Sequence, residues 1–194
     1  MSKQAKFDRD DVIEKAKNLY WQKGYHATSM RNLQEVVDMR PGSIYAAFGS
    51  KDNLFKEALN RYAQESNALL SECMAQETKV LQGLKRFLRT VTRCNERVAP
   101  NSMCMMVKTV SELTDNDTPE LLAIATGILE KVESSFTDIF QRAIDNGEIN
   151  KMKDPAELAR HFQIQIIGLR TYAQIKNNEQ AVEQFIDNIF KELH

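Results

Sequence analysis

The chain has 194 residues, a hydrophobic fraction of 42% and a formal net charge of −1, which together allow a buried core and exclude a disordered chain. Glycine and proline are few and no stretch alternates convincingly between apolar and polar residues, so the composition predicts an all-α fold. No apolar stretch approaches the length of a membrane span, and the N-terminus lacks the apolar core of a signal peptide. We therefore expect a cytoplasmic protein with no membrane partner.

The first predicted helix covers residues 8–23. Acidic residues occupy its first turn, apolar residues recur at helical spacing, and Gly24 supplies a left-handed stop. Residues 3–9 in front of it form a basic lead-in, which is either a disordered terminus or a mobile arm that lies along a DNA backbone.

Residues 28–51 contain two short helical patterns separated by a polar turn, which is the pattern of a helix-turn-helix. Thr28 or Ser29 can cap the first helix, and Asp38 in the turn tolerates a left-handed backbone. Pro41 suits the first position of the second helix, because its missing N–H has no partner within the helix there. The stretch therefore predicts two helices with a tight turn between them.

The second helix of this pair has an outward face of small residues, which permits close approach to the DNA major groove. Its N-terminus favours phosphates, Arg40 suits guanine, and Tyr45 and Lys51 suit phosphate oxygens. An ordinary helical hairpin inside a bundle is the alternative interpretation of this stretch alone. We predict DNA contacts from Thr28, Ser29, Arg40, Pro41, Gly42, Ser43, Tyr45, Ala46 and Lys51.

The charges are unevenly distributed along the chain. Residues 1–62 contain eleven Lys and Arg and eight Asp and Glu, so their net charge is +3; because the whole chain carries −1, the remainder carries −4. The basic part is the part with the helix-turn-helix pattern, which predicts DNA binding that weakens with salt.

Several motifs occur together between about Val12 and Leu59: Gly24-Tyr25, Thr28-Ser29-Met30, Gly42-Ser43-Ile44-Tyr45, and Phe48-Gly49-Ser50-Lys51 followed by Leu54. Over this stretch the sequence resembles the TetR family of bacterial transcriptional regulators, and beyond it the resemblance is architectural. Two positions depart from the family pattern, since Asp38 stands where glycine is usual and Arg40 stands where a small cap is usual.

The resemblance implies a helix-turn-helix DNA-binding domain at residues 1–52 and a helical ligand-binding and dimerisation domain at residues 53–194. It also implies a homodimer on a palindromic operator of double-stranded DNA, most often a repressor that is released by a small-molecule effector. The long helix that starts near residue 52 is then the element that carries the ligand signal.

Six further helices are predicted after the helix-turn-helix, at residues 52–73, 80–98, 103–113, 119–146, 156–176 and 180–193. Pro100 ends the second of these, and Asn101 or Ser102 caps the third. Thr118-Pro119 and Asp154-Pro155 each supply a cap and a proline for the helix that follows.

The last two predicted helices carry apolar residues on more than one face, so one face packs inward and another needs a partner. Pairing of this helical hairpin with its symmetry mate makes a four-helix interface, and the TetR family dimerises in this way. Two-fold pairing also spaces two recognition helices for successive major grooves. The predicted dimer contacts are Leu158, Phe162, Ile166, Leu169, Phe185 and Ile189.

Large apolar residues on the central helices are candidates for the effector pocket, although each of them also suits plain core packing. Flexible methionines near residue 105 suit a pocket for varied apolar ligands. The predicted pocket residues are Leu69, Phe87, Val91, Cys104, Met105, Met106, Val110, Phe136, Phe140 and Phe162.

Cys104 has two interpretations. A cap at Asn101 places it in the first turn of a helix, where the dipole favours a thiolate, and Lys108 lies one turn further on. The segment also resembles TetR-type regulators whose cysteine senses electrophiles or oxidants, except that Met103 stands where glycine usually precedes it. The alternative is a buried and inert thiol.

Two other classes of function compete with a regulator. An enzyme lacks support, because the histidines and the three cysteines show no metal spacing and no phosphate-binding loop is present. We therefore predict no enzymatic activity, no metal and no cofactor. A helical protein-interaction module explains the C-terminal hairpin and leaves the helix-turn-helix pattern without a role.

Overall fold

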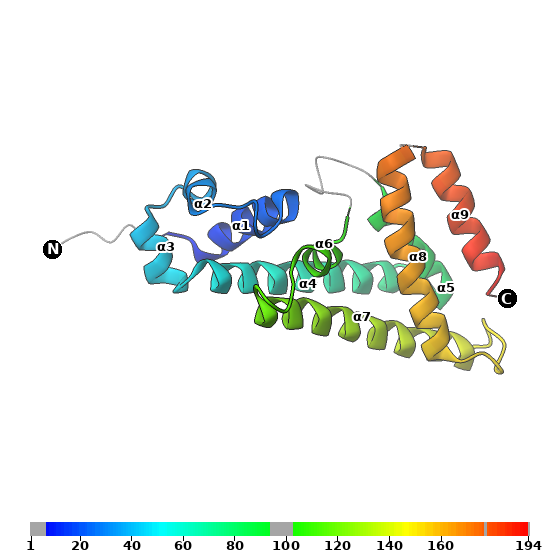
Figure 1. Cartoon of the computed structure of the whole chain (residues 1–194). Coiled ribbons are helices and arrows are strands. Elements are labelled where there is room, and N and C mark those ends of the chain that lie inside the picture. The colour runs from blue at the N-terminus through cyan, green and yellow to red at the C-terminus, as the bar shows by residue number, and fades with distance from the viewer. Residues whose placement is uncertain (1–6, 94–102, 177, 194) are drawn as a thin grey trace.

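A computed structural model describes residues 7–93, 103–176 and 178–193 of the chain (Figure 1). The secondary structure of these residues is helical, which confirms the predicted all-α fold, and none of the described helices is both long and apolar enough to cross a membrane. The helices are α1 (Arg9–Lys23), α2 (Met30–Val37), α3 (Pro41–Phe48), α4 (Lys51–Ala75), α5 (Val80–Thr92), α6 (Met105–Glu112), α7 (Pro119–Asp145), α8 (Pro155–Lys176) and α9 (Glu179–Lys191).

Local capping chemistry explains where the N-terminal helices begin and end. The Asp8 carboxylate accepts hydrogen bonds from two backbone N–H groups in the first turn of α1. Gly24 ends α1 with a φ of 92°, and Asp38 ends α2 in the left-handed conformation. Ser29 and Asn32 form a capping box at the start of α2. The predicted roles of Gly24 and Asp38 in stopping the two helices are thus confirmed.

The first core joins α1, α2 and α3 to the first half of α4. Tyr20 contacts Phe55 edge to face at 4.7 Å between ring centroids, and Trp21 contacts Tyr62 in the same way at 4.9 Å. The same core also includes buried residues of α6 and of the start of α7. Residues on both sides of the predicted 52/53 domain boundary therefore share one core.

The second core lies at the other end of the elongated chain, where α5, α8 and α9 gather around the second half of α4 and the end of α7 (Figure 1). Phe162 is its centre, with edge-to-face contacts to Phe136, Phe140 and Phe190 at centroid distances of 5.0, 5.7 and 6.0 Å. Because α4 and α7 contribute to both cores, they connect the two ends of the molecule.

Two predicted helix boundaries in the middle of the chain need correction. The helix expected to reach residue 98 ends at Thr92, because Arg93 has an extended backbone with a ψ of 113°. The next helix begins at Met105 with Cys104 as its N-cap residue, later than expected. The proposed caps at residues 101 and 102 lie outside the described residues, as do Pro100 and most of the basic lead-in.

Of the two caps expected for α7 and α8, only the cap of α8 is formed. Thr118 precedes α7 but its side chain makes no capping hydrogen bond, so that part of the prediction is wrong. Asp154 caps α8 as predicted, since its carboxylate accepts a hydrogen bond of 2.9 Å from the backbone N–H of Ala156.

Candidate nucleic-acid interface and effector pocket

The recognition helix, which we define as α3 with its cap Arg40, is anchored by two buried side chains. Ile44 and Phe48 face the first core, one turn apart. The opposite face is exposed and includes Tyr45, whose side chain is 48% exposed. The predicted contacts Arg40, Pro41, Gly42, Ser43, Tyr45 and Ala46 are all exposed on this helix and at its N-terminus.

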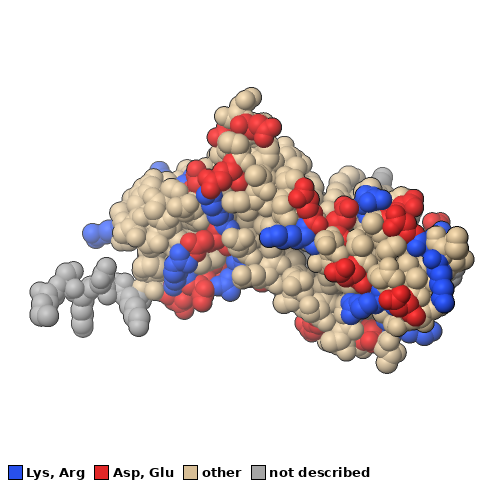
Figure 2. Space-filling view, turned by 90° about the horizontal axis from the view of Figure 1, so that it is seen from below, with Lys and Arg blue, Asp and Glu red and all other residues tan. Residues whose placement is uncertain are grey.

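Arg40 differs from most basic residues of the N-terminal unit. Its side chain is exposed and makes no capping hydrogen bond. By contrast, ion pairs to acidic residues engage Arg9, Lys15, Lys17, Arg31, Lys56 and Arg61. On the face shown in Figure 2, basic and acidic side chains are accordingly interspersed. Fewer basic side chains are therefore available to DNA at the recognition helix than the net charge of residues 1–62 indicates.

Three other predicted DNA contacts lie outside the recognition helix. Thr28 is fully buried and its hydroxyl donates a hydrogen bond of 2.6 Å to the carbonyl of Gly24, so its prediction as a DNA contact is corrected. The Lys51 ammonium donates to the carbonyl of Tyr25 at 2.7 Å and lies 4.1 Å from the centroid of that ring. Burial lowers the pKa of Lys51, with partial compensation from nearby carboxylates. Ser29 is exposed at the start of α2.

A cavity of about 110 Å³ lies between α4, α5, α6, α7 and α8. Of the predicted pocket residues, Phe87, Val91, Cys104, Met106 and Phe136 line it. Five others do not line it: Met105 belongs to the first core, Phe140, Phe162 and Leu69 belong to the second, and Val110 is exposed on α6. The periodic apolar pattern of the four core residues reflects core packing, which was the alternative interpretation of each, whereas Val110 belongs to neither core.

The cavity is also lined by polar groups, which the predicted set of pocket residues does not include. Arg170 is only 8% exposed, and its Nη1 donates a hydrogen bond of 3.3 Å to the Tyr62 hydroxyl. Burial raises the pKa of Tyr62, and a hydrogen bond with Cys104 raises it further, while Arg170 acts in the opposite direction. The signal in the sequence was a single arginine within the apolar stretch of residues 166–173.

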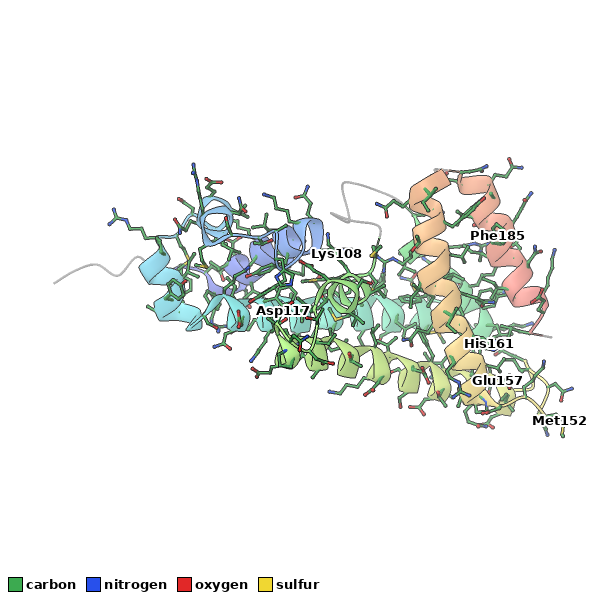
Figure 3. All side chains as sticks on the ribbon, viewed as in Figure 1. Lys108, Asp117, Met152, Glu157, His161 and Phe185 are labelled. Atoms are coloured by element: carbon green, nitrogen blue, oxygen red, sulfur yellow. The ribbon has the colours of Figure 1, made fainter. Side chains whose placement is uncertain are left out.

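Cys104 is half-buried at the N-terminus of α6, and its surroundings differ from those expected. The Lys108 ammonium donates to the carbonyls of Trp21 and Gln22, at 3.3 and 2.7 Å, so Lys108 reaches toward α1 (Figure 3). The polar neighbour of the Cys104 thiol is instead the Tyr62 hydroxyl. The expected influence of Lys108 on Cys104 is therefore corrected.

The end of α6 is bonded to the turn between α1 and α2. The Glu112 carboxylate accepts hydrogen bonds from the backbone N–H groups of Tyr25, at 3.0 Å, and His26, at 2.7 Å. Gly24 makes this contact possible, because a Cβ there would lie 2.4 Å from a Glu112 oxygen. Since the start of α6 lines the cavity, this one helix contacts both the cavity and the helix-turn-helix unit.

Most of the predicted dimer contacts do not lie on the outward faces of α8 and α9. Phe162 and Leu169 are buried in the second core, Ile166 lines the cavity, and Leu158 and Ile189 pack partly against the second core. Phe162 and Leu169 are therefore withdrawn as contacts. Among the predicted contacts, Phe185 is exposed, and it touches Tyr172 edge to face at 5.5 Å (Figure 3). The exposed apolar side chains on these helices are Ile164, Ile175 and Phe185.

A helix-turn-helix with an exposed recognition helix, joined by long helices to a unit with an internal cavity, defines a DNA-binding regulator. Residues 12–58 match the bacterial regulatory proteins of the tetR family, and residues 80–189 match the tetracyclin repressor-like C-terminal domain. The chain belongs to the TetR family and is a DNA-binding transcriptional regulator. The predicted resemblance is thereby confirmed.

Individual relatives agree with this assignment. The transcriptional repressor ComR of Escherichia coli is 28% identical over 171 residues, which cover 87% of this chain and 80% of ComR. The regulator YezE of Bacillus subtilis is 23% identical over 96% of both chains. A cysteine mutant of the TetR family regulator CifR, solved with a 26-base-pair operator DNA, matches 98% of both chains with a TM-score of 0.86 and 26% identity.

Proposed function

We propose that the protein is a homodimeric repressor that binds a palindromic operator and is released when an effector occupies the cavity between α4, α5, α6, α7 and α8. The observation that carries this proposal is the dual contact of α6. Cys104, Met106 and Val107 line the cavity, whereas Lys108 and Glu112 bind α1 and the turn after it. Such a regulator acts in the cytoplasm, where bacterial DNA lies.

Release of DNA requires only that the effector binds the DNA-incompetent arrangement more tightly than the competent one. An effector that displaces the start of α6 shifts Glu112 relative to the backbone N–H groups of Tyr25 and His26. Leaving the part-buried N–H of Tyr25 without an acceptor costs about 1–3 kcal/mol, so the turn follows α6 rather than separating from it. The two recognition helices of the dimer then lose the spacing that matches successive major grooves.

Two kinds of effector fit this cavity. Most of its lining is apolar, which supports a small ligand that binds reversibly. The Cys104 thiol in the wall, where Tyr62 also lies, supports an electrophile or oxidant that modifies the sulfur. Both alternatives use the same contact between α6 and the helix-turn-helix unit.

The proposed dimer pairs α8 and α9 with their copies around a two-fold axis. Ile164 and Ile175 on α8 are 66% and 72% exposed, and Phe185 is exposed on α9. Gly168 lies between the two isoleucines, and a Cβ there would contact nothing within 4 Å. A face that is apolar and flat at its centre suits close approach of a second helical hairpin.

The experiment that tests the proposal is a selection of bound duplexes from a random pool, with purified wild type and Cys104→Ser. We expect a palindrome, weaker binding at higher salt, and release by N-ethylmaleimide in wild type only if the thiol is the sensor. A palindrome that is indifferent to N-ethylmaleimide supports a reversible ligand. Failure to enrich any sequence at low salt contradicts the proposal and favours a protein-interaction module.

A further inference from the structure

Few basic side chains near the recognition helix lack an acidic partner. Between residues 7 and 62, the exposed Lys and Arg side chains without an ion pair to another described residue are Lys23 and Arg40. Lys23 lies in the last turn of α1, ~21 Å along the helix axis from Arg9, which contacts α3. Since DNA affinity depends largely on neutralised phosphates, one arginine at this end leaves most of that contribution to other parts of the chain.

The sequence supplies two further cations directly before the first described residue. Residues 1–6, the N-terminal segment, contain Lys3 and Lys6 and no acidic residue. These six residues lie outside the described part of the chain. The position of Phe7, the next residue, therefore limits which surface the two lysines can reach.

Phe7 packs against the recognition helix. Its ring centroid lies 6.4 Å from that of Phe48, which is in the last turn of α3. The Arg9 guanidinium lies over the same Phe48 ring, 4.8 Å from its centroid, and pairs with Glu57 of α4. Contacts with both α3 and α4 thus hold residues 7–9 beside the C-terminal turn of α3.

This place is close to the DNA backbone when α3 occupies the major groove. The eight residues of α3 span ~12 Å, and the groove is ~12 Å wide, so a residue beside the last turn is near an edge of the groove. A chain advances at most ~3.6 Å per residue, which keeps Lys6 within ~4 Å and Lys3 within ~15 Å of Phe7. Both lysines can therefore reach phosphates next to the bases that α3 contacts.

We propose that Lys3 and Lys6 bind operator phosphates outside the base pairs read by the recognition helix, and that the packing of Phe7 on Phe48 positions them. These contacts add affinity and carry no sequence information, because phosphates are alike in every sequence. The inference rests on the DNA-binding function and is independent of the cavity and its effector. It assigns base contact to Arg40 and most of the phosphate contact to the N-terminal segment.

The first test compares wild type with the double variant Lys3→Gln and Lys6→Gln on one operator duplex over a range of salt concentrations. The plot of log affinity against log salt is expected to become shallower by about 1.8 for each bound chain, since each phosphate contact contributes ~0.9. Affinity at about 0.1 M salt is expected to fall at least about tenfold, with the same selected sequence. An unchanged slope overturns the inference.

The matched control is the double variant Lys151→Gln and Lys153→Gln, which removes the same charge. These exposed lysines flank Met152 in the loop between α7 and α8, at the opposite end of the molecule from α3 (Figure 3). The control is expected to keep the slope of wild type. A slope that falls equally in both double variants assigns the effect to net charge and overturns the inference.

Two further measurements test where the contact lies and what positions it. Removal of the base pairs that flank the selected palindrome is expected to weaken binding of wild type and to leave the Lys3 and Lys6 double variant unchanged; an equal loss in both overturns the position of the contact. Phe7→Ser keeps both lysines and is expected to bind at least about threefold more weakly, because the segment is then less preorganised, whereas Phe7→Leu is expected to bind nearly as wild type does. Wild-type affinity in Phe7→Ser overturns the positioning role of Phe7.

Discussion

At the scale of single residues, Arg40 is the basic side chain best placed to contact a base. It is exposed at the start of α3 and its side chain makes no capping bond. We expect Arg40→Ala to weaken operator binding by about 1–3 kcal/mol and to relax the base preference at one position of each half-site. Selection of bound duplexes with the variant measures both effects.

The control for that prediction is Arg142→Ala, which removes an exposed arginine far along the chain on α7. It is expected to leave the selected sequence unchanged. Uniformly weaker binding of Arg40→Ala, with an unchanged preference among sequences, assigns Arg40 to a phosphate and contradicts the base contact.

Lys17 is the second residue whose surroundings allow a specific prediction, here for stability. Its ammonium is buried on α1 and pairs with Glu14 at 2.8 Å and with Glu65 of α4 at 2.5 Å. Lys17→Met leaves two carboxylates together without their cation. We expect a loss of about 1–3 kcal/mol of stability at neutral pH, below the ~3–5 kcal/mol of a fully buried pair because both carboxylates are half exposed.

This loss depends on pH with a definite sign. Burial raises the pKa of Glu65, and Lys17 opposes that shift, so removal of Lys17 raises the pKa further. A carboxyl whose folded pKa lies above its unfolded value binds more protons when folded, so the stability of the variant rises as pH falls. Urea unfolding is expected to show a deficit that narrows between neutral pH and about pH 5.

Lys15→Met is the matched control, because Lys15 lies on the same helix and pairs with Asp11 at the exposed surface. We expect it to cost less than about 0.5 kcal/mol at either pH. A deficit of Lys17→Met that stays constant over this pH range contradicts the assignment of Glu65 as the titrating group.

At the scale of secondary-structure elements, α6 is the proposed link between the cavity and the helix-turn-helix unit. Glu112→Ala removes the carboxylate that accepts the N–H groups of Tyr25 and His26. We expect ligands that release DNA from wild type to bind the variant with nearly the same affinity. Their effect on operator affinity is expected to be much smaller in the variant than in wild type. Titration of operator binding with and without ligand measures this coupling.

Ser111→Ala is the control on the same helix, since the Ser111 hydroxyl is exposed and donates only to the carbonyl of Val107 in its own helix. It is expected to preserve the coupling. If Glu112→Ala responds to ligand as fully as wild type does, the signal does not pass through this contact. Transmission through the long helix α4, which the family resemblance implies, then remains.

At the scale of the whole molecule, the proposed assembly predicts that the exposed apolar face of α8 and α9 is covered by a second copy. We expect the double variant Ile164→Lys and Phe185→Lys to sediment as a monomer, because two charges per chain meet at the two-fold axis. Operator affinity is expected to fall by at least about tenfold, since one half-site no longer reinforces the other.

Met152→Lys is the control for this experiment. Met152 is 91% exposed in the loop between α7 and α8, away from Phe185 (Figure 3). Its variant is expected to sediment as wild type does. A double variant that remains dimeric in analytical ultracentrifugation shows that another face forms the dimer.

Local chemistry made much of the fold predictable. Gly24 and Asp38 stop helices because their backbones tolerate positive φ. Pro41 starts a helix because the N–H that proline lacks has no partner at that position. The inward position of Ile44 and Phe48 follows from their spacing alone. The exposed face of α3 was therefore readable from the sequence. The burial of Thr28, whose hydroxyl donates to the carbonyl of Gly24, and the bond from Lys51 to the carbonyl of Tyr25 were not.

The cavity and its connection to the helix-turn-helix unit required the tertiary structure. Tyr62 and Arg170 are separated by 108 residues, and Glu112 reaches the N–H of Tyr25 across 87 residues. Periodicity states that a side chain such as Phe162 is buried, but it does not state which helices cover it. The sequence by itself determined which segments are helical, the stops at Gly24 and Asp38 and the inward side of α3, because these depend on neighbours in the chain. Only long-range packing decided which polar groups meet in the cavity.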